Sequence, residues 1–306
     1  MLVESLFCRV GGLSDLSIKG SFLPVFLISS LCFSQIHAAG PSAVADSGLK
    51  TKVYIIGVVH TANERRNADS LIKFLGDIRP DLILDETDTL SGYFKKDYTL
   101  ARPSWRYNVA RSLRLARDMP PENKAMYRYV AMDPSVKALP FDLAITRRRK
   151  YIRRMERNDG AYVRDVNRVY QGGGLPDSLK KVHDGYVAFS SWLYETTLDG
   201  YREINRPVVI DSIRALYRLE STHVPALMDA VPALERHRAW KEEDAAYWKH
   251  RNETMAANIL RFLQTTQAQR VVVFTGLLHK YYLLDLLSPV AGSLGFELVE
   301  FTDHSL

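Results

Sequence analysis

Two short apolar runs near opposite ends of the chain are each followed by Gly-x-x-His, and this repeated arrangement constrains the fold more than any other sequence feature. The first run is Val53–Ile56, followed by His60, and the second is Val271–Phe274, followed by His279. Apolar, β-branched runs of this length are typical of strands that are buried on both faces, as in parallel sheets. We therefore predict two related α/β units, each with a histidine just beyond a buried strand.

Helical and strand patterns follow each of these runs. Apolar residues at helical spacing lie between residues 63 and 76, and an apolar run over 82–84 comes next. The second half continues with a helical pattern over 281–287 and a further strand pattern over 296–301. The order strand, helix, strand predicts two parallel βαβ halves and a mostly parallel sheet, which is the α/β fold class.

The middle of the chain, about residues 93–248, is rich in aromatic residues, arginine and glutamate at helical spacings. We interpret it as a long helical insertion between the two halves of one α/β domain that covers residues 52–306. The stretch 139–144 is apolar enough to add one strand to the sheet. With 306 residues, 46% of them hydrophobic and 25% charged, the chain has an ordinary globular composition that can bury such a core.

His60, Glu86 and His279 each lie a few residues past a predicted buried strand. The carboxyl ends of parallel strands line the ligand crevice, so we expect these three side chains to meet at one edge of the sheet. Two imidazoles and a carboxylate can bind zinc, manganese, iron or cobalt and leave positions open for water. Such a divalent ion would lower the pKa of its bound water and create a hydrolytic nucleophile. Without a metal, one histidine could act as general base, with Glu86 orienting it.

Gly57 and Gly276 are the first residues of the two Gly-x-x-His motifs. We expect each glycine to let the backbone turn sharply as it leaves the strand, so that the histidine faces the crevice. A phosphate-binding loop is the competing interpretation, but neither motif has the second glycine or the lysine that would cradle a phosphate.

Arg251 lies on the apolar face of a predicted helix, because Met255 and Ile259 follow it at helical spacing. An inward guanidinium needs an anionic partner, and the candidates are Glu86, a substrate carboxylate and an oxyanion. We expect Arg251 to stabilise the anionic intermediate of a reaction at this edge of the sheet.

Each of these residues also has a structural interpretation. A lone buried histidine or carboxylate is often only hydrogen-bonded in the core, and Arg251 could lay its stem on the core with its head in water. Their joint placement at one sheet edge favours the functional interpretation. Glu64 and Glu300 are weaker acidic candidates. The remaining histidines lie in polar sequence surroundings and are interpreted as structural: His183, His223, His237, His250 and His304.

The N-terminal segment has the pattern of a secretory signal peptide. The apolar run Phe22–Phe33 follows basic residues and precedes a small-residue cleavage pattern. We predict a signal peptide over 1–38, a linker over 39–51, and an exported protein that is periplasmic or secreted. Cys8 and Cys32 both fall in the predicted signal peptide, which disfavours a disulfide framework, a cysteine zinc site and a catalytic cysteine.

The formal net charge of +6 is concentrated in residues 147–168, which contain nine Lys or Arg and three acids. Interleaved tyrosines resemble a nucleic-acid surface, but an exported protein meets little nucleic acid, so we expect no such partner. A solvated helix face is the ordinary interpretation of such a segment. Contact with anionic membrane headgroups or acidic substrates is the functional one.

The sequence resembles the TraB/TIKI superfamily, which includes the pheromone-shutdown proteins and, more distantly, erythromycin-esterase-like and ChaN-like proteins. The resemblance rests on Gly-Val-Val-His at 57–60, the acidic end of Leu-Ile-Leu-Asp-Glu at 82–86, Arg-Asn-Glu-Thr-Met-Ala at 251–256, and Gly-Leu-Leu-His at 276–279. The middle of the chain matches nothing in that pattern, and we expect it to determine substrate choice.

The resemblance implies a duplicated α/β domain with a site between its halves. It also implies that His60, Glu86 and His279 are catalytic or metal-binding residues, with Arg251 and Asn252 in a helical site motif. Members of the superfamily include metal-dependent proteases and antibiotic esterases, and the ChaN branch binds haem. Membership alone therefore does not fix the reaction.

Two functional hypotheses follow. The leading one is an exported, metal-dependent hydrolase that acts on a peptide or a small ester through His60, Glu86 and His279. The competing one is a non-catalytic periplasmic protein that binds haem or a signal peptide in the same crevice. Tyr281 and Tyr282, beside His279, support the second hypothesis because they could flank a flat ligand.

Overall fold

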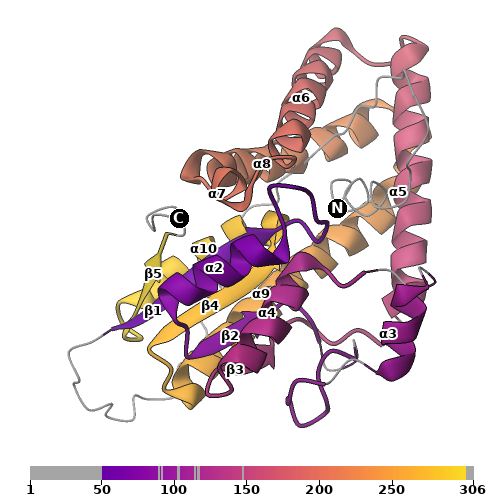
Figure 1. The fold of residues 1–306 in the computed structure, drawn as a ribbon. Coiled ribbons are helices and arrows are strands. Elements are labelled where there is room, and N and C mark those ends of the chain that lie inside the picture. Colours follow the sequence, from indigo (N-terminus) through magenta and orange to yellow (C-terminus); the bar gives the residue numbers. More distant parts are fainter. Residues whose placement is uncertain are drawn as a thin grey trace.

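The protein is described by a computed structural model that covers residues 50–300, apart from gaps at 89, 91, 102–103, 114, 116–117 and 147. Figure 1 shows a sheet with helices packed against it and a set of long helices that extends away from the sheet. The predicted signal peptide, nearly all of the predicted linker, both cysteines and His304 lie outside the described residues.

Five parallel strands form the sheet in the order β3-β2-β4-β1-β5. The strands are β1 Thr51–Val58, β2 Leu82–Asp85, β3 Lys137–Pro140, β4 Arg270–Gly276 and β5 Phe296–Val299. The two predicted βαβ units interleave, because β4 lies between β1 and β2 while β1 lies between β4 and β5. The predicted α/β class is confirmed, and the apolar stretch near residue 139 does add a strand, β3.

The helices lie between and around these strands. They are α2 Ala68–Ile78, α3 Trp105–Ser112, α4 Pro121–Met132, α5 Arg148–Gln171, α6 Asp177–Thr196, α7 Tyr201–Ile204, α8 Pro207–Ala230, the 3-10 helix η1 Pro232–His237, α9 Arg238–Thr266 and α10 Leu277–Ala291. Segment 93–248, predicted as a helical insertion, also contributes to the sheet layer. It contains strand β3 and helix α4, which packs beside α2. No helix of the described part of the chain is long and apolar enough to cross a membrane.

Both faces of the sheet are covered, which explains the uninterrupted apolar runs of β1 and β4. Tyr54 points to one face, where its ring meets Phe74 of α2 edge-on with the ring centroids 6.4 Å apart. Val53, one residue earlier, points to the opposite face and packs in a cluster with Met255 of α9 and Leu283 of α10. Alternate residues of a strand point to opposite faces, so a strand buried on both sides needs apolar residues throughout.

Gly57 serves a different purpose from the one predicted. It lies inside β1 rather than in a turn. A Cβ built on Gly57 would lie 2.7 Å from Leu277 Cδ1 and 3.1 Å from Leu277 Cα, at the start of α10. Its amide donates to Asn205 Oδ1 at 2.7 Å, and Asn205 Nδ2 donates back to the Gly57 carbonyl at 2.9 Å. The glycine is therefore required for the close approach of α10 and Asn205 to the strand.

Candidate functional site

The candidate site lies at the carboxyl ends of β1, β2, β3 and β4. His60 follows β1, Glu86 follows β2, Asp142 follows β3, and Gly276 ends β4. The chain leaves β1 toward β2 through α2, and leaves β4 toward β5 through α10, so the connections from these neighbouring strands run in opposite directions. Strand ends at which neighbouring connections run in opposite directions are where ligands bind in open α/β sheets.

The three predicted chemical residues converge around Gly276. A Cβ built on this glycine would lie 3.4 Å from Glu86 Oε2, 3.4 Å from His279 Cδ2 and 3.4 Å from His60 Nε2. The φ of Gly276 is −52°, so this residue has no need of the conformational freedom of glycine. The three side chains instead approach the position that a side chain on Gly276 would occupy.

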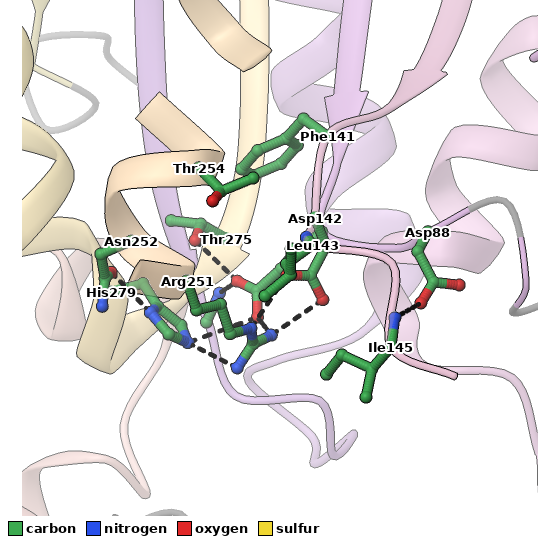
Figure 2. Close-up of polar contacts among 12 residues, drawn as sticks. Asp88, Phe141, Asp142, Leu143, Ile145, Arg251, Asn252, Thr254, Thr275 and His279 are labelled. Carbon is green, nitrogen blue, oxygen red and sulfur yellow. Dashed lines mark hydrogen bonds and ion pairs between the residues drawn. The ribbon is translucent and has the colours of Figure 1, made fainter. Parts of the chain in front are cut away.

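Arg251 occupies the middle of a buried polar network (Figure 2). Its Nη2 donates to Glu86 Oε1 at 2.7 Å and to Asp142 Oδ2 at 3.0 Å, and its Nε donates to Asp142 Oδ1 at 2.8 Å. All three side chains are almost fully buried. The inward orientation predicted for Arg251 is thus present, with Glu86 and the unpredicted Asp142 as its anionic partners. Bidentate contacts of this kind fix a guanidinium in position.

Glu86 is held on both of its carboxylate oxygens. Thr275 Oγ1 donates to Oε2 at 2.7 Å, the amide of Gly276 donates to the same oxygen, and Arg251 binds the other oxygen. Burial raises the pKa of Glu86, but the neighbouring His279, Arg251 and His60, together with the hydrogen bond from Thr275, outweigh burial and lower that pKa to about 2. Glu86 is therefore an ionised, fully engaged carboxylate.

His279 is held on both ring nitrogens and against an aromatic ring. Its Nδ1 lies 2.7 Å from Asn252 Oδ1, and its Nε2 lies 3.0 Å from Arg251 Nη1. A guanidinium only donates, so Nε2 must accept and Nδ1 must carry the proton that Asn252 receives. Trp248 stacks on the imidazole with the ring centroids 4.2 Å apart. Asn252, predicted from the helical motif, thus sets the tautomer of His279.

His60 forms a second unit with Glu122, the second residue of α4. His60 Nδ1 lies 2.6 Å from Glu122 Oε1, and the His60 side chain is 54% exposed whereas that of Glu122 is 4% exposed. Burial lowers the pKa of His60, but the charge and hydrogen bond of Glu122, with the charges of Glu86 and Asp85, outweigh it and raise that pKa to about 9. Glu122 thus orients the imidazole, which leaves Nε2 directed to the centre of the site.

Asp85 adds a third buried carboxyl beside this pair. It ends β2 and accepts a hydrogen bond from Asn123 Nδ2 at 2.8 Å. Burial and the charges of Glu122 and Glu86 raise the pKa of Asp85 to about 7, against the opposing effects of Thr87 and His60.

We expect Asp85→Asn to stabilise the protein at alkaline but not at acid pH. The folded-state pKa of Asp85 lies above its unfolded value, so its favourable contribution is present below the unfolded pKa and is lost as pH rises through about 7. Asparagine keeps the acceptor for Asn123 and cannot ionise. Urea unfolding measures how much more stable the variant is than the wild type at each pH. We expect this difference to increase by more than about 1 kcal/mol between about pH 4 and about pH 8. A difference that does not change with pH would contradict the assignment.

These residues do not fit a divalent ion shared by His60, Glu86 and His279. A metal ligand must direct a lone pair at the ion. Glu86 Oε1 and His279 Nε2 are instead in contact with the Arg251 guanidinium. Within the described ranges, no group of three or more His, Cys, Asp or Glu residues is arranged to hold a metal. Arg251 is the cation that this group holds, and the predicted metal remains a hypothesis.

Sequence reasoning missed Asp142, Glu122, Asn123 and Asp85 as site residues. Asp142 had the same signal as Glu86, because it follows a strand of the same parallel sheet. Glu122 and Asn123 had no such signal, since they come from the first turn of a helix that is distant in sequence from both histidine motifs.

The other candidates lie apart from this site. His183 and His223 are buried against each other, and His237 is buried in a pair with Asp165. They are buried because α6, α8 and η1 pack their inner faces together. Glu64 is exposed, and Glu300 accepts from Lys280 Nζ at 3.5 Å.

Comparisons with protein-family models, with curated proteins and with solved structures found no match for this chain. The TraB/TIKI resemblance therefore remains a prediction from four short motifs.

Proposed function

We propose that this protein is an exported hydrolase of ester or peptide bonds in which His60 is the acid–base group. The observation that carries the proposal is the half-exposed His60, which is oriented by the buried Glu122 and directs Nε2 toward Gly276, where Glu86 and His279 also approach. A histidine held by a carboxylate on one nitrogen and open on the other is the arrangement that general base catalysis requires.

In the proposed reaction, His60 Nε2 removes a proton from a water molecule, which attacks the substrate carbonyl carbon. Glu122 accepts the hydrogen bond from Nδ1 and stabilises the imidazolium that forms. The imidazolium then lies beside the developing oxyanion and later returns its proton to the leaving alcohol or amine. This sequence follows the general logic of a base oriented by a carboxylate.

Arg251 has a positioning role in this proposal. Its charge is balanced by two buried carboxylates, Glu86 and Asp142, so it offers no excess positive charge to an oxyanion. It instead fixes Glu86 and His279 at the carboxyl ends of the strands. This differs from the direct stabilisation of an anionic intermediate that the sequence predicted.

The alternative of haem binding is supported less by the contacts of the described residues near His279. His279 is 1% exposed and both of its ring nitrogens are engaged. Tyr281 is buried and packs against Tyr217, with the ring centroids 5.1 Å apart, rather than facing the crevice. The binding hypothesis is therefore kept only as an outcome of the test below.

The test is a panel of p-nitrophenyl esters and fluorogenic peptides, assayed with purified protein before and after dialysis against a chelator, together with metal analysis. We expect turnover of at least one ester or peptide that survives chelation. Turnover that is lost on chelation and restored by a divalent ion would instead support the predicted metal-dependent mechanism. No turnover, with an absorbance shift on haem titration, would favour the binding hypothesis.

A further inference from the structure

Helix α3 presents an apolar stripe to solvent. Trp105, Val109 and Leu113 lie four residues apart, on one face of the helix and its C-terminal continuation, and are 71%, 47% and 63% exposed. Leu115, two residues further on, is 79% exposed. Figure 1 shows α3 at the periphery, apart from the sheet. Single exposed apolar residues are ordinary, but a run of them on one face marks an interaction surface.

The same segment is strongly basic. Residues 101–117 contain five arginines, at positions 102, 106, 111, 114 and 117, and no aspartate or glutamate. The guanidinium of Arg106 lies 5.7 Å from the centroid of the Trp105 ring. Aromatic and aliphatic residues on one face, together with arginines and no acids, form the pattern of helices that lie in the interface of anionic membranes.

We propose that α3 docks the protein on an anionic lipid bilayer, with the stripe of Trp105, Val109 and Leu113 in the boundary between headgroups and acyl chains. Tryptophan suits this position because its ring is apolar and its N–H can reach the wet headgroup layer. A second copy of the chain fits the stripe poorly, since pairing two α3 helices would bring together four arginines, Arg106 and Arg111 of each copy, and no acids. Eight residues of helix span about 12 Å, so the docking is shallow and reversible.

The membrane contact that the sequence predicted through residues 147–168 stays a separate prediction, and part of the charge in that segment is paired within the protein. In α5, two of the acids are buried and paired, Asp159 with Lys241 and Asp165 with His237. Arg154 of the same helix is paired with Glu243 of α9. The charge of α5 is therefore partly used within the protein, whereas α3 combines basic charge with exposed apolar side chains. The proposal is independent of the hydrolase site.

The test compares the full wild-type chain with a W105S/V109S/L113S variant in sedimentation with vesicles of phosphatidylglycerol and phosphatidylcholine. Both proteins carry the same N-terminal apolar segment, so the difference between them reports on α3. We expect the variant to bind at least about tenfold more weakly, because three apolar side chains no longer enter the interface. Binding of the wild type should also weaken with added salt and with vesicles of phosphatidylcholine alone.

A matched control is Trp192→Ser, which removes a 42% exposed tryptophan from α6 and should leave vesicle binding unchanged. Circular dichroism and thermal unfolding should be the same for all of these proteins, because the substituted residues are exposed. Equal binding by the wild type and the triple variant, whether strong or absent, would overturn the proposal. So would light scattering that shows a dimer in the wild type and a monomer in the triple variant.

Discussion

Replacing His60 by alanine is expected to lower kcat/KM of the proposed hydrolase by about 10²–10⁴-fold, the range that general acid–base groups contribute. His60 is the one predicted site residue that combines solvent exposure with a buried carboxylate partner, so its loss removes the proton acceptor and leaves the buried network around Arg251 in place. The measurement is steady-state kinetics on the best ester or peptide of the panel.

The matched control is His250→Ala. His250 is exposed on α9, one residue before Arg251, and its replacement should leave kcat/KM unchanged. An unchanged rate in the His60 variant would contradict the proposed mechanism, whatever substrate is found.

The pH dependence of the hydrolysis rate distinguishes whether His60 acts as a general base or as a general acid. A base must be deprotonated, so the rate of the wild type should rise with pH toward the His60 pKa of about 9. Glu122→Gln removes the largest of the influences that raise the pKa of His60. The substitution should therefore move the rise in rate to lower pH. A rate that instead falls as pH rises through about 9 would identify His60 as the general acid.

Replacing Arg251 by alanine is expected to destabilise the fold by about 3–5 kcal/mol, the effect of removing one partner from a buried ion pair. The variant removes the Arg251 guanidinium from the buried Glu86 and Asp142 and from His279 Nε2. Urea unfolding at neutral pH measures the change, and kcat/KM should fall with it because the wall of the crevice loses its fixed geometry.

Arg261→Ala is the matched control on the same helix. Arg261 is exposed, so its replacement should change the free energy of unfolding by no more than about 0.5 kcal/mol. Adding Glu86→Gln and Asp142→Asn to Arg251→Ala should recover part of the lost stability, since the two buried negative charges that Arg251 neutralised disappear. A loss below about 1 kcal/mol for Arg251→Ala alone would show that the network is not what holds this edge of the sheet.

The sequence was sufficient to predict the parallel strands and the meeting of His60, Glu86, His279 and Arg251. Those predictions rely on local patterns, because a run of apolar residues identifies a strand buried on both faces and the parallel arrangement places all carboxyl ends at one edge. The interleaving of β1, β4 and β2 could not be predicted, since strand order depends on contacts between segments more than 180 residues apart.

The sequence likewise could not predict which carboxylate pairs with which histidine or arginine. Glu86 was expected to orient a histidine, but Glu122 orients His60 and Glu86 binds Arg251. Both glutamates are ordinary acids in sequence. Only packing decides which of them reaches the imidazole, because a hydrogen bond requires its two atoms to lie within about 3 Å.

By itself, the sequence determined the chemical groups at the edge of the sheet, because hydrophobic periodicity fixes which residues follow each buried strand. The tertiary structure decided which of those groups contact one another. A buried guanidinium needs anionic neighbours, and Arg251 therefore engages the predicted metal ligands Glu86 and His279. His60 is left half exposed with Glu122 as its partner, and this is the arrangement that changes the proposal from a metal centre to an acid–base pair.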